Sequence, residues 1–214
     1  MWSALKSPLL IGNDLRELSA ESLTILNNPA IIAINQDPLG SAAFLIRKDT
    51  NVKKDKYGMG EAHVWSGSLW GGDQLVVLFN AANEDLDIEA SLEEIFYYQG
   101  PEGSAPHVQQ NWQAYDLWAN RMDLATAQKI IDAGDDTVAS EKILQEVNWY
   151  NSTEISYKDG LKAGDERLLG KKVEIIKARG VLKRRVKKHS AEVFRLKNTG
   201  DKVKQYTMVA KDEL

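Results

Sequence analysis

The hydrophobic pattern at the N-terminal end of the chain predicts the order helix, strand, helix. Residues 8–11 (PLLI) are a short run that is apolar on both sides, which is typical of a strand in a parallel sheet covered on both faces. The helix after it is expected to begin at its capping residue Ser19, to carry Glu21 in its first turn and to stop at residues 27–29 (NNP). Residues 1–6 are interpreted as the end of a preceding helix. This order is the repeat unit of an α/β barrel or a doubly wound sheet, so partner strands are expected outside the chain.

The pattern changes to strand-like alternation after residues 35–40, where turn residues without periodicity indicate a domain boundary. The clearest feature beyond it is a hairpin with a glycine-rich turn at residues 71–73. Loops are expected at the charged stretch 51–60 and at the break over 100–103. Strands are expected at residues 43–47, 63–70, 74–80, 86–92, 114–118, 173–176, 180–186 and 192–196.

Helical spacing returns in one region inside this β pattern. Leu124, Ala127 and Ile130 share one face of a helix, and Ile143 and Leu144 belong to a second. We interpret the region near residues 123–148 as a helical insertion on the surface of the β domain. The chain from residue 198 onward is polar and is expected to be a tail.

Composition narrows the classes of protein and of site. The 214 residues are 43% hydrophobic and 27% charged, as in soluble globular proteins, and the net charge of −4 argues against nucleic acid as a partner. No apolar run approaches the roughly 20 residues of a membrane span. The absence of cysteine excludes disulfides, thiolate metal sites and a cysteine nucleophile. His63, His107 and His189 are too scattered to predict a metal site, and no glycine-rich phosphate motif is present.

Two surface features have two interpretations each. The basic run at residues 183–188 is either a patch for nucleic acid or heparin, or an exposed strand edge protected by lysines, and the predicted position favours the edge. Trp65 and Trp70 are either aromatic residues that cover the core or a platform on which a sugar stacks, and we favour the core.

Several ungapped motifs resemble a known family. The start of the chain, MWSALKSPLLIGNDL at residues 1–15, is followed at the family's separation by AINQDPLG at residues 33–40. Together they resemble the end of the catalytic barrel in glycoside hydrolase family 27, the α-galactosidases and α-N-acetylgalactosaminidases. Similar motifs, most like the fungal branch, continue at residues 63–69 (HVWSGSL), 75–80 (LVVLFN), 115–121 (YDLWANR), 150–157 (YNSTEISY) and 189–196 (HSAEVFRL).

The resemblance implies a mainly β chain in three parts. Residues 1–37 are expected to be the last strand and helix of a catalytic (β/α)8 barrel, and residues 38–197 a C-terminal antiparallel β-sandwich with the helical insertion. Residues 198–214 are the polar tail. The resemblance also implies that the sandwich supports the barrel and can contribute to contacts within a homo-oligomer.

The resemblance further implies a retaining α-galactosidase without a cofactor. One aspartate attacks the anomeric carbon of a terminal α-linked galactose, and a second protonates the leaving oxygen and then activates water. In the family these aspartates lie on earlier barrel strands, so no catalytic residue is assigned and the chain alone is expected to be inactive. Residues that distinguish galactose from N-acetylgalactosamine also lie outside this chain.

Asn13 and Asp14 are the candidates for contact with the substrate. They follow the last barrel strand at its C-terminal end, where barrel enzymes carry their active sites. The alternative is that Asp14 holds its loop, for example by pairing with Arg16.

A second hypothesis is a non-catalytic β-sandwich module that binds carbohydrate or another protein. Exposure of Trp65, Trp70 or Trp118 in a groove favours this module, and burial of all three counts against it. We rank this hypothesis below the first, because in an independent module the apolar surface of the strand at residues 8–11 would stay exposed to solvent.

Two short motifs indicate the secretory pathway. Lys211, Asp212, Glu213 and Leu214 form the ER-retention address at the C-terminus. Asn151 begins the glycosylation motif Asn-Ser-Thr, which requires the same compartment. No signal peptide is visible in the chain, so we expect a longer precursor whose product is retained in the ER lumen or secreted.

Overall fold

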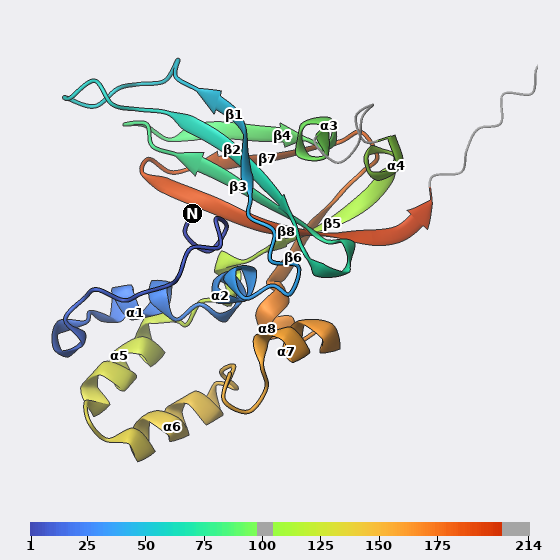
Figure 1. Cartoon of the computed structure of the whole chain (residues 1–214). Helices are drawn as coiled ribbons and strands as arrows, with labels where there is room; N and C mark the ends of the chain where they lie inside the picture. The colour runs from blue at the N-terminus through green and yellow to red at the C-terminus, as the bar shows by residue number, and fades with distance from the viewer. Residues whose placement is uncertain (98–104, 203–214) are drawn as a thin grey trace, which may run out of the picture.

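The computed structural model describes residues 1–97 and 105–202. Its strands form a six-stranded antiparallel sheet in the order β1-β2-β3-β8-β5-β6 and a two-stranded antiparallel sheet, β4-β7, which packs over one face of the first (Figure 1). The larger sheet contains β1 (Phe44–Asp49), β2 (Ala62–Ser68), β3 (Gln74–Asn80), β8 (Ser190–Lys202), β5 (Gln110–Asp116) and β6 (Lys171–Ile176). The smaller sheet contains β4 (Leu86–Ser91) and β7 (Val181–Val186).

The core between the two sheets follows from alternation along the strands. Val76 and Leu78 of β3 and Phe194 of β8 point to one face of the six-stranded sheet, where they meet Ile88 of β4 and Leu182 of β7. All five side chains are almost fully buried. This arrangement confirms the predicted mainly β fold class with an antiparallel sandwich.

The opposite face of the six-stranded sheet is covered as well. Leu75 and Val77, the alternate residues of β3, pack against Ala30 and Ile34 of helix α2 (Pro29–Asn35). β3 is therefore buried on both faces, which explains its continuous apolar sequence. Residues 1–37, which we call the N-terminal segment, form a third layer on the sandwich.

The predicted hairpin is confirmed. β2 and β3 pair in register from Ala62 opposite Asn80 to Ser68 opposite Gln74. The turn between them contains Gly71 and Gly72, with φ angles of 79° and 81°. Residues with side chains rarely adopt this conformation, so the two glycines are required there.

The N-terminal segment differs from its prediction in three places. Residues 8–11 are not a strand: they form an extended, exposed segment without a pairing partner among the described residues. Residues 1–6 form turns rather than a helix end. Helix α1 (Ala20–Leu26) begins after Ser19, as predicted, but Pro29 starts a second helix, because proline is favoured at a first helical position.

The predicted helical insertion is confirmed as α5 (Leu124–Ala133) and α6 (Thr137–Glu146). Two shorter helices follow, α7 (Tyr157–Ala163) and α8 (Glu166–Leu169), which the sequence pattern did not predict. The expected location of the insertion is wrong in part. Ala127 and Ile130 of α5 pack with Ala20 and Leu23 of α1, so the insertion lies against the N-terminal segment (Figure 1).

The remaining differences concern element ends. Residues 92–95 and 105–108 form the short helices α3 (Leu92–Ile95) and α4 (Ala105–Val108), where a strand end and a loop were expected. β5 ends at Asp116, before a 3-10 turn, rather than at residue 118. β8 continues to Lys202, so residues 198–202 extend a strand instead of starting the tail. The loop expected at 100–103 and the C-terminal tetrapeptide lie outside the described residues.

Candidate functional site

Asn13 and Asp14 lie on the surface, in the loop after the exposed apolar segment. Asp14 accepts a hydrogen bond from the Arg16 backbone N–H at 3.0 Å, and its carboxylate forms an ion pair with the Arg16 guanidinium at 2.6 Å. The hydrogen bonds from Arg16 lower the pKa of Asp14. The structure therefore shows the loop-holding contact considered as the alternative, and contact with substrate remains a prediction.

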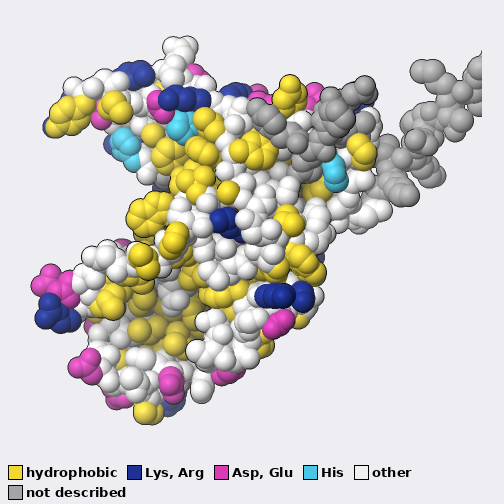
Figure 2. All heavy atoms as spheres, viewed as in Figure 1, with side chains coloured by type: hydrophobic (Ala, Val, Ile, Leu, Met, Phe, Trp, Pro, Cys, Tyr) yellow, Lys and Arg dark blue, Asp and Glu magenta, His cyan; other side chains and the backbone are white. Residues whose placement is uncertain are grey.

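A large hollow beside this loop is apolar. It has a volume of about 1010 Å³. Its walls come from the N-terminal segment, from Phe79 at the end of β3, from Trp118 after β5 and from Tyr157 at the start of α7. Figure 2 shows hydrophobic side chains gathered in a hollow in the lower half of the molecule, where Figure 1 places the helices. We call this hollow the apolar groove.

The side chains that the N-terminal segment contributes to the apolar groove are unusually exposed. Leu10 is 80% exposed, Trp2 67%, Ile11 57% and Ile25 49%. Scattered exposed apolar residues are normal, but a contiguous apolar surface of this kind is typical of a site that contacts another polypeptide or a ligand. The groove is therefore suited to binding a further layer of protein.

A buried ionic cluster joins the N-terminal segment to the sandwich. Arg195 of β8 donates a hydrogen bond to Asp73 at 2.9 Å and lies 3.7 Å from the Asp37 carboxylate. Lys197 also pairs with Asp73 at 2.9 Å, and Asp37 accepts a hydrogen bond from the Trp70 backbone N–H at 2.9 Å. The side chains of Arg195 and Asp37 are 2% and 0% exposed. The cluster fixes the position of the N-terminal segment from inside the protein.

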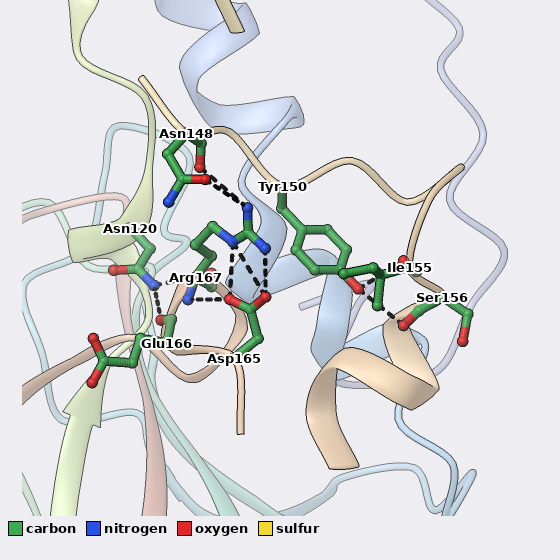
Figure 3. Close-up of polar contacts among 8 residues, drawn as sticks. All are labelled: Asn120, Asn148, Tyr150, Ile155, Ser156, Asp165, Glu166 and Arg167. Atoms are coloured by element: carbon green, nitrogen blue, oxygen red, sulfur yellow. Dashed lines mark hydrogen bonds and ion pairs between the residues drawn. The ribbon is translucent and has the colours of Figure 1, made fainter. Parts of the chain in front are cut away.

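A polar network holds the end of the helical insertion against the sandwich (Figure 3). Arg167 pairs with Asp165 at 2.6 Å and donates to the side-chain oxygen of Asn148 at 3.1 Å. Its guanidinium also lies 5.1 Å from the centre of the Tyr150 ring. The hydrogen bonds from Arg167 lower the pKa of Asp165. Asn120, which follows β5, donates to the backbone oxygens of Glu166 and Arg167 at 2.8 and 3.0 Å.

The Tyr150 hydroxyl connects the same network to α7. It donates to the backbone oxygens of Ile155 and Ser156 at 2.8 and 2.9 Å (Figure 3). Burial raises the pKa of this hydroxyl, which favours its protonated, donating form. Asn151, the predicted glycosylation residue, follows on the surface and accepts a hydrogen bond from the Thr153 hydroxyl at 2.7 Å.

The tryptophans are neither all buried nor all exposed. Trp70 is 39% exposed, and Trp65 is half-buried beside His63. Trp118 lines the apolar groove and donates its indole N–H to the Ala191 oxygen at 2.8 Å. Trp118, which lies in a groove, and Trp70, which is exposed, are therefore the two tryptophans placed to contact a ligand.

Three residues of the basic run form ion pairs with acidic side chains of neighbouring strands. Arg185 of β7 lies 3.6 Å from Asp87, Arg184 lies 2.5 Å from Glu174, and Lys183 lies 3.9 Å from an acidic side chain of β4. These contacts agree with the interpretation as an exposed strand. Within residues 1–97 and 105–202, no three histidine or acidic side chains gather in a group able to hold a metal ion. None of the helices in the described part of the chain has the length and apolar character to cross a membrane.

Comparison with known proteins decides the family. Residues 1–37 match Melibiase_2, described as alpha galactosidase A, and residues 59–141 match Melibiase_C, described as the alpha galactosidase C-terminal beta sandwich domain. An α-galactosidase of Saccharomyces paradoxus is 40% identical over 201 residues, which are 93% of this chain and 40% of the relative. The structure of the α-galactosidase MEL1 from Saccharomyces cerevisiae superposes with a TM-score of 0.83 at 37% identity, covering 92% of this chain and 42% of that one. The chain corresponds to the C-terminal portion of the family 27 α-galactosidases.

The family 27 resemblance predicted from the sequence motifs is thus confirmed. The chain spans about 40% of the length of the curated relatives it matches. A family 27 β-L-arabinopyranosidase from Geobacillus stearothermophilus, at 15% identity and a TM-score of 0.54 over 94% of this chain and 29% of that one, shares the fold alone. The predicted boundary at residue 37 stays a prediction.

Proposed function

We propose that the protein to which this chain belongs is an α-galactosidase, a retaining glycoside hydrolase that releases terminal α-linked galactose from an oligosaccharide or glycoconjugate. The support is the 40% identity to the S. paradoxus α-galactosidase over nearly the whole chain. The two catalytic aspartates belong to the part of the relatives that this chain does not span. The chain alone is therefore expected not to hydrolyse galactosides, and its function is to support the catalytic barrel.

The observation that supports the proposed role of this chain, packing against the catalytic barrel, is the apolar groove. Its exposed residues Leu10 and Ile11 belong to the segment 1–37 that matches the alpha galactosidase A family, whereas Phe79 and Trp118 belong to the sandwich side. The N-terminal segment and the sandwich thus both contribute to a surface that the described residues do not cover. Such a surface is suited to packing against the remaining elements of a barrel. In the assembled enzyme residues 8–11 take the strand conformation predicted from their sequence, because neighbouring strands then supply the missing hydrogen bonds.

The proposal includes roles for single residues. Asn13 and Asp14 follow this strand and approach the substrate at the C-terminal face of the completed barrel. Asn151 is exposed, as a glycosylated asparagine must be, and glycosylation would accompany passage through the ER to retention or secretion. The enzyme uses no cofactor, and the sandwich can contribute to a homo-oligomer.

A chimera tests the proposed activity. In it, this chain replaces the matching C-terminal part of the S. cerevisiae α-galactosidase, and release of nitrophenol from p-nitrophenyl α-galactoside is measured. We expect hydrolysis by the chimera and none by the 214-residue chain. A folded chimera without activity, or an active isolated chain, contradicts the proposal. Asp14→Asn in the chimera should lower kcat/KM, whereas a loop-holding role alone should lower thermal stability instead.

The non-catalytic module remains a second candidate because Trp118 lines the groove and Trp70 is 39% exposed. It requires that the isolated chain bind a ligand in the groove. Two results together would favour the module. Methyl α-galactoside would quench the tryptophan fluorescence of the isolated chain but not that of Trp118→Ala, and the chimera would be inactive.

A further inference from the structure

A second pocket lies away from the apolar groove and shares no lining residue with it. Its volume is about 510 Å³, which falls within the roughly 300–1,000 Å³ typical of ligand pockets. Its walls come from chain segments that are distant in sequence: residues 115–121 at the end of β5 and after it, residues 147–150 after α6, and residues 166–172 around α8 and β6. We call it the amide pocket, after Asn120 and Asn148 in its walls.

Local structure fixes the two amides in place. Helix α6 ends at Glu146, and Asn148, two residues later, has a φ of 50°. The next N–H, that of Trp149, returns to the Leu144 oxygen at 2.8 Å. Asparagine tolerates this left-handed conformation better than most residues, so it suits the helix end. The side-chain oxygen of Asn148 is held by Arg167, and the amide nitrogen of Asn120 is held by two backbone oxygens (Figure 3).

These contacts use one end of each amide. Among the described residues, Asn120 Oδ1 and Asn148 Nδ2 form no hydrogen bond. One acceptor and one donor are thus available in the walls of the amide pocket, from side chains whose other amide ends are held. Such preorganised groups bind a polar ligand without a further cost for ordering them.

Part of the remaining lining is aromatic or tightly packed. Tyr115 and Trp149 are half-buried aromatic residues in the lining of the amide pocket. Gly170, with a φ of 90°, allows the backbone to approach closely, since a Cβ there would lie 2.6 Å from the Asp116 oxygen. Ring surfaces beside fixed amides suit a ligand with both apolar faces and hydroxyl edges, which is the character of a sugar ring.

The charges at the amide pocket are unbalanced. Arg121, Lys171 and Lys172 are exposed cations in its lining, and Glu166 is the exposed acid. Arg167 contributes no excess charge, because it is paired with Asp165. The pocket is therefore cationic on a chain whose net charge is −4, and it favours an anionic ligand.

We propose that the amide pocket binds a saccharide unit that carries an acidic group, a phosphate or a carboxylate. The ring lies against Tyr115 and Trp149, the hydroxyls meet Asn120 and Asn148, and the acidic group faces the cations. This site is separate from the proposed galactose hydrolysis, and it is present in the chain without the catalytic barrel.

Calorimetric titration of the full 214-residue chain tests the proposal. The probes are galactose 6-phosphate and galacturonate, with methyl α-galactoside and inorganic phosphate for comparison. We expect one of the acidic sugars to bind at least tenfold more tightly than either comparison compound. Equal binding of methyl α-galactoside overturns the acidic-group assignment, equal binding of phosphate overturns the sugar assignment, and no binding of either acidic sugar overturns both.

Variants locate the binding. The double variant Lys171→Gln, Lys172→Gln should weaken binding of the acidic sugar at least tenfold, and Lys183→Gln, a matched change of an exposed lysine on β7, should leave it unchanged. All three side chains are on the surface, so thermal melting should show intact folding. Undiminished binding by the double variant contradicts the location.

Discussion

Arg195 and Asp37 face each other inside the protein, 3.7 Å apart, although one belongs to the last strand and the other to the end of the N-terminal segment. Asp73, in the turn between β2 and β3, shares the same guanidinium at 2.9 Å. Three distant parts of the chain thus meet at one arginine. The N-terminal segment is part of the folded unit for this reason, and also because Ala30 and Ile34 of α2 cover the six-stranded sheet.

Removal of Arg195 should be strongly destabilising. Arg195→Met leaves Asp37 and Asp73 as buried carboxylates without their guanidinium partner, and breaking a buried ion pair in this way costs about 3–5 kcal/mol. The free energy of unfolding in urea measures the effect. Lys183→Met removes one side of an exposed pair at 3.9 Å and should cost less than about 1 kcal/mol. Equal effects of the two changes would contradict the buried cluster.

The packing of α7 on the polar network depends on Gly160. A Cβ at this position would lie 2.5 Å from the Tyr150 hydroxyl and 2.8 Å from a Leu168 methyl group. Gly160→Ala should therefore lower the free energy of unfolding by about 1–3 kcal/mol, although alanine favours helix by about 1 kcal/mol. Thermal unfolding checks the result against Gly12→Ala, where nothing lies within 4 Å. A stabilised Gly160→Ala variant would show that α7 packs less closely.

The ion pair of Asp165 with Arg167 should make stability depend on pH. Arg167 holds the pKa of Asp165 below its ordinary value of 3.8, so the carboxylate stabilises the fold fully above that value. The stabilisation is lost as the pH falls through the lowered pKa of the folded protein. Asp165→Asn keeps a residue that can cap α8, so it removes mainly the charge.

At pH 7 the free energy of unfolding of Asp165→Asn should be about 1–2 kcal/mol lower than that of the unmodified chain. This difference should shrink as the pH falls below 3.8. Urea unfolding at a series of pH values measures it. Asp87→Asn, on an exposed pair at 3.6 Å, should change stability by no more than about 0.5 kcal/mol. A difference for Asp165→Asn that grows toward low pH would contradict the lowered pKa.

Local patterns were sufficient to predict most of the sandwich. Leu86, Ile88 and Ala90 alternate with polar residues and form β4, and the two glycines after Trp70 mark the hairpin turn. The first two helices of the insertion were found because ten residues each give a clear helical period. α8, with four residues, is too short for such a period.

Errors arose where structure depends on distant residues. The sequence of residues 8–11 favours a strand, but a strand requires pairing partners that this chain does not supply. The ionic cluster was not predicted, because no local pattern connects Asp37 with Arg195. The sequence did indicate an uncovered apolar surface at the N-terminal end, but the opposite wall of the groove, with Phe79 and Tyr157, comes from other parts of the chain.

Hydrogen exchange of residues 9–15 tests most directly whether the apolar groove receives the catalytic barrel. Deuterium uptake is compared between the isolated chain and the S. cerevisiae chimera, with β3 as a protected reference and residues 51–60 as an exposed one. We expect rapid exchange at residues 9–15 in the isolated chain, where they are exposed, and slow exchange at residues 9–11 in the chimera, where they pair as a strand. Rapid exchange in both proteins, with the references unchanged, would contradict the account.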